Sequence, residues 1–194
     1  MKLRTMLTVT LMAVISFLIM FIEMPLPIFP EFLKIDISDI PALVTGIVLG
    51  PLAGIAVEAL KNVLHLLRTS TGGVGELANF LVGAALILPP ALLYKKHQSR
   101  KGLLVGLLFG IILMAVVGGL ANYYILMPFY QNFMPLEAII GMCSKVNPAI
   151  KDMQTMILYA IIPFNILKGI VVSVITLLLY GKLTPIFKKM TQEV

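Results

Sequence analysis

Long apolar runs separated by short polar segments dominate the chain. The runs cover about residues 5–21, 42–50, 51–67, 76–94, 103–127 and 156–180. Because a helix of about 20 apolar residues crosses the hydrocarbon core of a bilayer, the pattern predicts an all-α integral membrane protein with six transmembrane helices. Residues 1–194 then form a single transmembrane domain. The run 42–50 is short for a full crossing, so residues 42–67 can also be interpreted as one bent element.

Two segments interrupt this pattern. After the first run, Pro25, Pro27 and Pro30 exclude a regular helix, although their segment is apolar enough to pack against protein. Residues 128–155 are less apolar, and we expect a long loop with some helix. The first run follows two basic residues, as in a signal peptide, but no small-residue cleavage pattern follows it, which predicts an uncleaved helix.

The distribution of charge orients the predicted helices. Only 12% of the residues are charged and 59% are apolar, which excludes a soluble globular protein. With a cytoplasmic N-terminus, nine of the fifteen basic residues lie on the cytoplasmic side. These are Lys2, Arg4, Lys95, Lys96, Arg100, Lys101, Lys182, Lys188 and Lys189. Because cytoplasmic loops are enriched in Lys and Arg, we expect a multi-pass protein of the cell membrane with both termini in the cytoplasm.

Several function classes are disfavoured by what the sequence lacks. Orientation accounts for the basic residues, so the isoelectric point near 9.5 does not indicate a nucleic-acid partner. One cysteine and two histidines 32 positions apart argue against an intrachain disulfide and a metal cluster. Motifs of nucleotide-binding loops, zinc proteases and serine hydrolases are not found. We therefore expect a binding protein with no catalytic residues and no metal.

Four polar residues lie in the run 51–67, where lipid would disfavour them. Glu58, Lys61, Asn62 and His65 have helical spacing that places them on one face, with Glu58 and Lys61 close enough to pair. An ionisable side chain in a span costs roughly 2.5 to 3.5 kcal/mol unless it has a partner or faces water. An internal ion pair that fixes helix packing is one interpretation, and the wall of an aqueous cavity is the other.

The last apolar run, residues 156–180, gives a clearer indication of a ligand site. Asn165 and Lys168 share one face of the helix, in its outer half under the predicted orientation. An amide beside a cation can bind a flat heterocycle with adjacent carbonyl and N–H groups, whereas snorkelling of Lys168 to the cytoplasmic side would require a long reach. Asn122, Glu76 and Asn79 are expected at a similar depth. These positions predict a small-molecule pocket that opens outward beneath the proline-rich segment.

Small residues give a weaker signal about packing. Gly46, Gly50 and Gly54 recur at intervals of four, as do Gly106 and Gly110. This spacing lets membrane helices approach closely, and it assigns no function by itself.

Seven motifs, in order along the chain, resemble those of one transporter family. They are Pro25-Leu-Pro27, Leu33-Lys-Ile-Asp-Ile-Ser-Asp-Ile-Pro-Ala-Leu43, Gly50-Pro-Leu-Ala-Gly54, Lys61-Asn-Val-Leu-His65, Gly75-Glu-Leu-Ala-Asn-Phe80, Asn122-Tyr123 and Pro163-Phe-Asn-Ile-Leu-Lys-Gly169. The family is that of the riboflavin-specific S components of energy-coupling factor (ECF) transporters. The resemblance implies a six-helix fold that holds the vitamin near the outer face. It also implies a membrane T protein and two cytoplasmic ATPases as partners, with riboflavin as the transported ligand and no cofactor.

The same resemblance implies roles for individual residues. Asn165, Lys168 and Asn122 are the expected contacts to the flavin ring, while Asn79, Asp36 or backbone groups are the candidates for binding the ribityl hydroxyls. Glu58, Lys61, Asn62, His65 and Glu76 belong either to the polar pocket or to the structural framework. Members of the family often carry an AxxxA row of small residues on the first helix for docking on the T protein. This chain departs from that pattern, and its nearest rows are Thr5, Val9, Ala13 and Ala13, Ser16.

Two alternatives remain open at this stage. An S component for another flat vitamin or a flavin analogue would share most of these features. A stand-alone proton-coupled carrier would instead use Glu58 and Lys61 as a proton relay. An integral membrane enzyme is disfavoured because no nucleophile, metal set or acid–base pair is evident.

Overall fold

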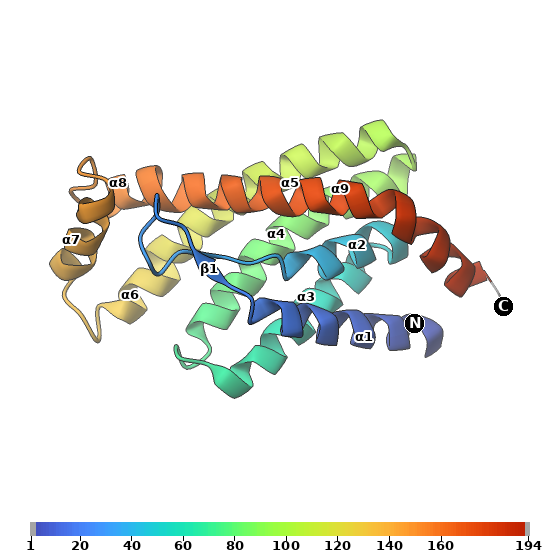
Figure 1. Cartoon of the computed structure of the whole chain (residues 1–194), viewed down its shortest axis with the longest axis horizontal. Coiled ribbons are helices and arrows are strands. Elements are labelled where there is room, and N and C mark those ends of the chain that lie inside the picture. The colour runs from blue at the N-terminus through green and yellow to red at the C-terminus, as the bar shows by residue number, and fades with distance from the viewer. Residues whose placement is uncertain (1–2, 193–194) are drawn as a thin grey trace.

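The chain folds as a bundle of helices (Figure 1). The computed structural model describes residues 3–192, and of residues 182–192 it describes the backbone alone. The α-helices are α1 (Leu3–Met20), α2 (Asp39–Leu49), α3 (Pro51–His65), α4 (Val74–His97), α5 (Arg100–Ala121), α6 (Met127–Tyr130), α7 (Leu136–Val146), α8 (Met153–Met156) and α9 (Ile162–Gln192). A 3-10 turn, η1 (Leu66–Arg68), and two π-helical segments, η2 (Asn122–Leu126) and η3 (Ile157–Ile161), complete the helical elements.

Four helical stretches are long and apolar enough to span a bilayer. Within the described residues these are Leu3–Met20, Val74–His97, Arg100–Tyr130 and Met153–Gly181, and they match four of the six predicted spans. With 11 and 15 residues, α2 and α3 fall short of the ~20 that a full crossing needs. The count of six therefore stays a prediction.

The predicted boundary between the second and third runs is correct. Leu49 ends α2 and Pro51 begins α3, with only Gly50 between them, at a φ of 100° that side-chain-bearing residues rarely adopt. The two helices then pack closely, because a Cβ on Gly54 would lie 2.6 Å from Cα of Gly46. Residues 42–67 are thus two packed helices and not one bent element.

The other glycine repeat also serves packing. A Cβ on Gly106 would lie 2.5 Å from Cα of Pro90, and one on Gly110 would lie 2.6 Å from the carbonyl oxygen of Leu86. The backbones of α4 and α5 therefore touch along this seam, as the spacing predicts.

The proline-rich segment contains no helix, as predicted, but it has structure that the sequence pattern did not reveal. Strands β1 (Met24–Pro25) and β2 (Lys34–Ile35) form a two-residue antiparallel ladder that joins the ends of the segment. A side-chain ion pair between Lys34 and Glu23 lies beside the ladder. We call residues 22–38 the first loop. The expected loop at 128–155 contains α7 and most of α6 and α8.

Both ends of the described chain lie at the same end of the molecule. Figure 1 shows the start of α1 and the end of α9 together on the right, with the first loop and α7 toward the other end. Among the nine residues predicted to be cytoplasmic, Lys2 lies outside the described residues. Lys182, Lys188 and Lys189 lie where the backbone alone is described.

The small residues of α1 face inward. Val9, Ala13 and Ser16 are buried, and the Ser16 hydroxyl donates a hydrogen bond to the carbonyl oxygen of Ser38. Large apolar side chains such as Leu7 and Leu11 cover the outer face of the helix. Val9, Ala13 and Ser16 therefore hold α1 against the bundle.

Candidate functional site

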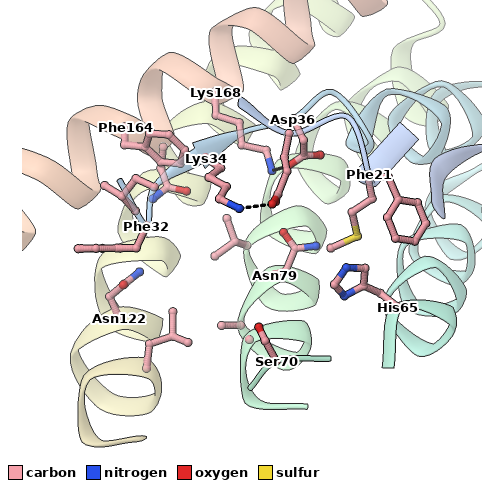
Figure 2. A pocket seen from close by; sticks show the side chains of 18 of the residues that line it. Phe21, Phe32, Lys34, Asp36, His65, Ser70, Asn79, Asn122, Phe164 and Lys168 are labelled. Carbon is pink, nitrogen blue, oxygen red and sulfur yellow. Dashed lines mark hydrogen bonds and ion pairs between the residues drawn. The ribbon is translucent and has the colours of Figure 1, made fainter. Parts of the chain in front are cut away.

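A cavity of about 710 Å³ lies where the first loop meets the ends of several helices (Figure 2). Six of the ten predicted polar site residues line it: Asp36, His65, Asn79, Asn122, Asn165 and Lys168. They come from the first loop, α3, α4, η2 and α9. Glu58, Lys61, Asn62 and Glu76 do not line the cavity. Asn62 and Glu76 contact the lining residues Asn79 and His65 from behind, and Glu58 and Lys61 lie one contact further from the cavity.

Two buried amides form one wall of the cavity. Asn122 donates from Nδ2 to the carbonyl oxygen of Gly118 at 2.9 Å, and Asn165 donates from Nδ2 to that of Ile161 at 2.8 Å. Each of these bonds uses one N–H of the amide and leaves the Oδ1 acceptor and a second N–H. The side chains of Phe164, Leu126 and Tyr130 line the cavity around this pair. The wall therefore combines apolar surface with amide donors and acceptors.

Both amides lie next to the π-helical segments. Asn122 begins η2, and Asn165 follows the end of η3 by four residues, hydrogen-bonded to its last carbonyl. A π-helical turn carries one residue more than an α-helical turn, so the side chains that follow it shift around the helix axis. Sequence reasoning missed both segments, because hydropathy and spacing do not distinguish them from α-helix. They recur at functional sites in other proteins.

Glycine makes room for one of these amides. A Cβ on Gly118 in α5 would lie 2.6 Å from Nδ2 and 2.7 Å from Cγ of Asn165. The absence of a side chain at position 118 therefore lets the α9 amide pack directly on α5. The sequence analysis did not single out this glycine.

Lys168 is held by carboxylates at the edge of the cavity. Its Nζ lies 2.8 Å from Oδ2 of Asp36 and 3.2 Å from Oδ2 of Asp39, and the side chain is almost fully buried. Figure 2 shows Lys168 and Asp36 meeting at one side of the cavity. Lys168 therefore does not snorkel, since its ammonium group is bonded to the first loop and the start of α2.

The ion pairs continue behind the wall as a buried network. Lys61 Nζ lies 2.6 Å from Oδ1 of Asp39 and 2.7 Å from Oε1 of Glu58, which confirms the predicted Glu58–Lys61 pair. Asp36, Asp39 and Glu58 thus share the two lysines Lys61 and Lys168. Formally, three carboxylates face two ammonium groups; Asp39, Glu58 and Lys61 are closed to solvent, whereas Asp36 and Lys168 line the cavity.

Asp39 is the important residue that the sequence analysis did not select. It is 1% exposed and bridges the lysines of α3 and α9. Its place at the start of α2, just before a fully apolar stretch, is the signal that could have drawn attention to it.

Electrostatics favour the ionised form of Asp36. Burial by itself would raise the pKa of this carboxyl, but the nearby ammonium groups of Lys168 and Lys61 and hydrogen bonds from Lys168 and Ser38 lower it well below its ordinary value. The link between the first loop and α9 is therefore a charged pair at neutral pH.

A second polar cluster lies at the rim of the cavity. Oε1 of Glu76 lies 2.8 Å from Nδ1 of His65, while its Oε2 accepts hydrogen bonds from Thr69 at 2.9 Å and Thr71 at 3.1 Å. The cluster connects the end of α3 to the start of α4. His65 lines the cavity, and Glu76 holds it in place from behind.

Comparison with known proteins gives a consistent family assignment. The family model described as the substrate-specific component of ECF transporters matches residues 4–180. The riboflavin transporter FmnP of Bacillus subtilis (strain 168) is 40% identical over 190 residues, covering 95% of this chain and 94% of the relative. The riboflavin transporter RibU of Staphylococcus aureus (strain TCH60) is 36% identical over 186 residues, covering 96% and 93%.

A solved structure agrees with these relatives. It is described as the S component of a bacterial ECF transporter and superposes with a TM-score of 0.76 at 34% identity, covering 97% of this chain and 99% of that one. The resemblance carried by the sequence motifs is thereby confirmed. Because the family model and the relatives cover nearly the whole chain, the chain belongs to the family of substrate-specific components, or S components, of ECF transporters.

Proposed function

We propose that this protein binds riboflavin at the outer face of the cell membrane as the substrate-specific subunit of an ATP-driven ECF transporter. The observation that best supports this proposal is that six polar side chains line one cavity of about 710 Å³. They come from the first loop and from four helical elements. This volume lies within the range of roughly 300 to 1,000 Å³ that small-molecule sites occupy. The choice of riboflavin as the ligand rests on the relatives that are named as riboflavin transporters.

The chemistry of the cavity suits a flavin. An isoalloxazine ring has an apolar dimethylbenzene edge and a uracil-like edge with two carbonyls and an N–H. We assign the uracil-like edge to the amides of Asn122 and Asn165, which offer both donors and an acceptor. Phe164 and Leu126 supply apolar contacts for the ring faces. A ligand without the N–H and carbonyls would leave these buried amides unpaired, at roughly 1 to 3 kcal/mol each.

Lys168 has a less direct role in this proposal. Because its ammonium group is already paired with Asp36 and Asp39, we assign it to the edge of the ligand site, where it also holds the first loop on α9. Of the remaining predicted residues, Asn79 is assigned to the ribityl chain. Glu58, Lys61, Asn62 and Glu76 are assigned to the framework behind the wall.

Energy for uptake would come from partners. The relatives are transporters and not enzymes. We propose a T protein and two cytoplasmic ATPases of an ECF module as partners, six transmembrane segments in a single domain, and both termini in the cytoplasm. The excess of basic residues in the corresponding segments supports this orientation.

Uptake in cells tests the proposal. The chain is expressed in a bacterial strain that lacks flavin synthesis and uptake, with an ECF module whose ATPases are either intact or inactivated. Riboflavin uptake is expected only with the intact module. Equal uptake with inactive ATPases would contradict the ATP-driven assignment and favour a stand-alone carrier.

Competition distinguishes the remaining alternative within the family. An excess of unlabelled riboflavin is expected to abolish the uptake of labelled riboflavin, and other flat vitamins are expected to leave it unchanged. The proton-relay alternative is not favoured, because Glu58 and Lys61 are closed off from the cavity within the buried ion network.

A further inference from the structure

A chain of three hydrogen-bonded side chains leads from the buried ion network to the cavity. It runs from Glu58 through Asn62 to Asn79. We propose that Glu58, which does not touch the ligand, is a positioning residue that fixes the orientation of the Asn79 amide. In that orientation, Oδ1 of Asn79 accepts a hydrogen bond from a hydroxyl group of the ribityl chain. The inference rests on the proposed function, since it presumes a flavin in the cavity.

Glu58 sets the direction of the first hydrogen bond. Its Oε1 lies 2.7 Å from Lys61 Nζ and 3.0 Å from Nδ2 of Asn62. A lysine ammonium group has donors only, so Oε1 must act as an acceptor. The side chain is fully buried, and a Cβ on Gly83 of α4 would overlap its carboxylate. Packing therefore holds Glu58 in place.

The hydrogen bonds to Glu58 fix the orientation of the Asn62 amide. Its Nδ2 donates to Oε1 of Glu58 and to the backbone oxygen of Glu58, at 3.0 and 2.9 Å. A flipped amide would place its oxygen against two acceptors, so the Oδ1 atom must point the other way. There it accepts a hydrogen bond from Nδ2 of Asn79 at 2.9 Å.

The hydrogen bond from Asn79 to Asn62 determines which atom of the Asn79 amide faces the cavity. Because its Nδ2 faces Asn62, its Oδ1 lies on the opposite side of the amide, and it accepts no hydrogen bond from the described residues. Figure 2 shows the side chain extending into the space between Asn122 and His65. The wall at this point therefore offers an acceptor, which suits a ligand hydroxyl.

The position in the cavity selects the ribityl chain. The amides and aromatic side chains assigned to the ring lie on η2 and α9, whereas Asn79 lies on α4 near His65 and Ser70. A flavin whose ring lies against the wall formed by Asn122 and Asn165 directs its ribityl chain toward Asn79. Lumiflavin, which carries a methyl group in place of the ribityl chain, lacks the hydroxyls that Asn79 would bind.

Comparison of riboflavin with lumiflavin tests the inference. Binding of both ligands to the detergent-purified full chain is measured for wild type, Glu58→Met and Glu58→Gln. Glu58→Met leaves Asn62 with one acceptor, the backbone oxygen of residue 58, in place of two. Riboflavin binding is therefore expected to weaken by about three- to tenfold, at most the effect of one hydrogen bond, and lumiflavin binding is expected to change by less than about twofold. Glu58→Gln keeps the Oε1 acceptor, and its amide nitrogen replaces an oxygen that accepts no hydrogen bond, so near wild-type binding is expected.

Double variants provide the decisive comparison. Asn79→Ala is expected to show the same selective loss of riboflavin, and Glu58→Met is expected to add nothing to it, because both act on one hydrogen bond. Equal losses for both ligands, additive losses, or no loss would overturn the inference. If Glu58→Met does not fold, Asn62→Leu takes its place in the same cycle. Failure of wild type to bind either flavin would instead reject the proposed function.

Discussion

Lys61 and Lys168 stay in the protein interior because carboxylates replace the water that their ammonium groups would otherwise bind. Asp39 contacts both lysines, while Asp36 and Glu58 each contact one. An unpaired charge at this depth would be strongly unfavourable, so the five side chains stabilise the fold only as a set. The set also connects four parts of the chain, since it joins the first loop and α2 to α3 and α9.

The lowered pKa of Asp36 predicts how stability depends on pH. Asp36→Asn mimics the protonated side chain and is expected to lower the thermal stability of the detergent-solubilised protein at neutral pH, by about 1.5 to 3 kcal/mol for the loss of a charged hydrogen bond. A carboxyl whose folded-state pKa is lowered contributes stability above its ordinary value of 3.8 and loses it as the pH falls toward the folded-state value. The difference between wild type and variant is thus expected to be constant from about pH 8 to 5 and to shrink only below about pH 4.

Thermal unfolding of both proteins across this pH range is the measurement. Glu137→Gln removes an exposed carboxyl on α7 and serves as the control, with no expected change. A difference that already disappears between pH 7 and 5 would contradict an ionised Asp36 paired with Lys168.

Residue spacing along one helix predicted the Glu58–Lys61 pair, because side chains three positions apart on a helix are neighbours. The contacts of Asp39 and Asp36 with Lys168 cross more than 120 positions of sequence and depend on how the first loop and α2 lie against α9. Periodicity within a run contains no information on such contacts. The polar residues within apolar runs nevertheless marked the cavity, since lipid excludes them.

At the scale of elements, the cavity depends on the contact between α5 and α9. The π-helical segment η2 directly follows α5, η3 directly precedes α9, and Gly118 lets the Asn165 amide pack on α5. Hydropathy predicted both helices, but it could not predict the π-helical segments, because an additional residue in one turn leaves the apolar composition unchanged. The two-residue ladder of the first loop was missed for a similar reason, since its strands are too short for an alternating pattern.

Gly118→Ala tests this contact without removing a polar group. The added methyl would overlap the Asn165 side chain and displace its amide, so riboflavin binding is expected to weaken by about tenfold or more. The same loss is expected for Asn165→Ala, which removes the amide itself. Gly141→Ala is the matched control, because a Cβ at that position on α7 meets open space. Titration of flavin fluorescence gives both affinities. Wild-type affinity in Gly118→Ala would mean that Asn165 does not contact the ligand.

At the scale of the whole molecule, a compact set of polar residues lies within a largely apolar bundle. The low fraction of charged residues and the apolar runs predicted a membrane protein, and the ordered motifs predicted the family that the comparisons confirm. Orientation and partners depend on the bilayer and on other subunits, so they remain predictions. The inward-facing Val9, Ala13 and Ser16 leave α1 with an outer face that consists mainly of large apolar side chains.

Equilibrium binding of riboflavin to the purified chain tests the central proposal most directly. In detergent, without partner subunits, addition of the protein is expected to quench flavin fluorescence and saturate at one riboflavin per chain, because all the residues assigned to the site belong to this chain. Lumiflavin is expected to compete, and a vitamin without an isoalloxazine ring is not. A correctly folded protein that leaves the fluorescence of riboflavin unchanged would contradict the account.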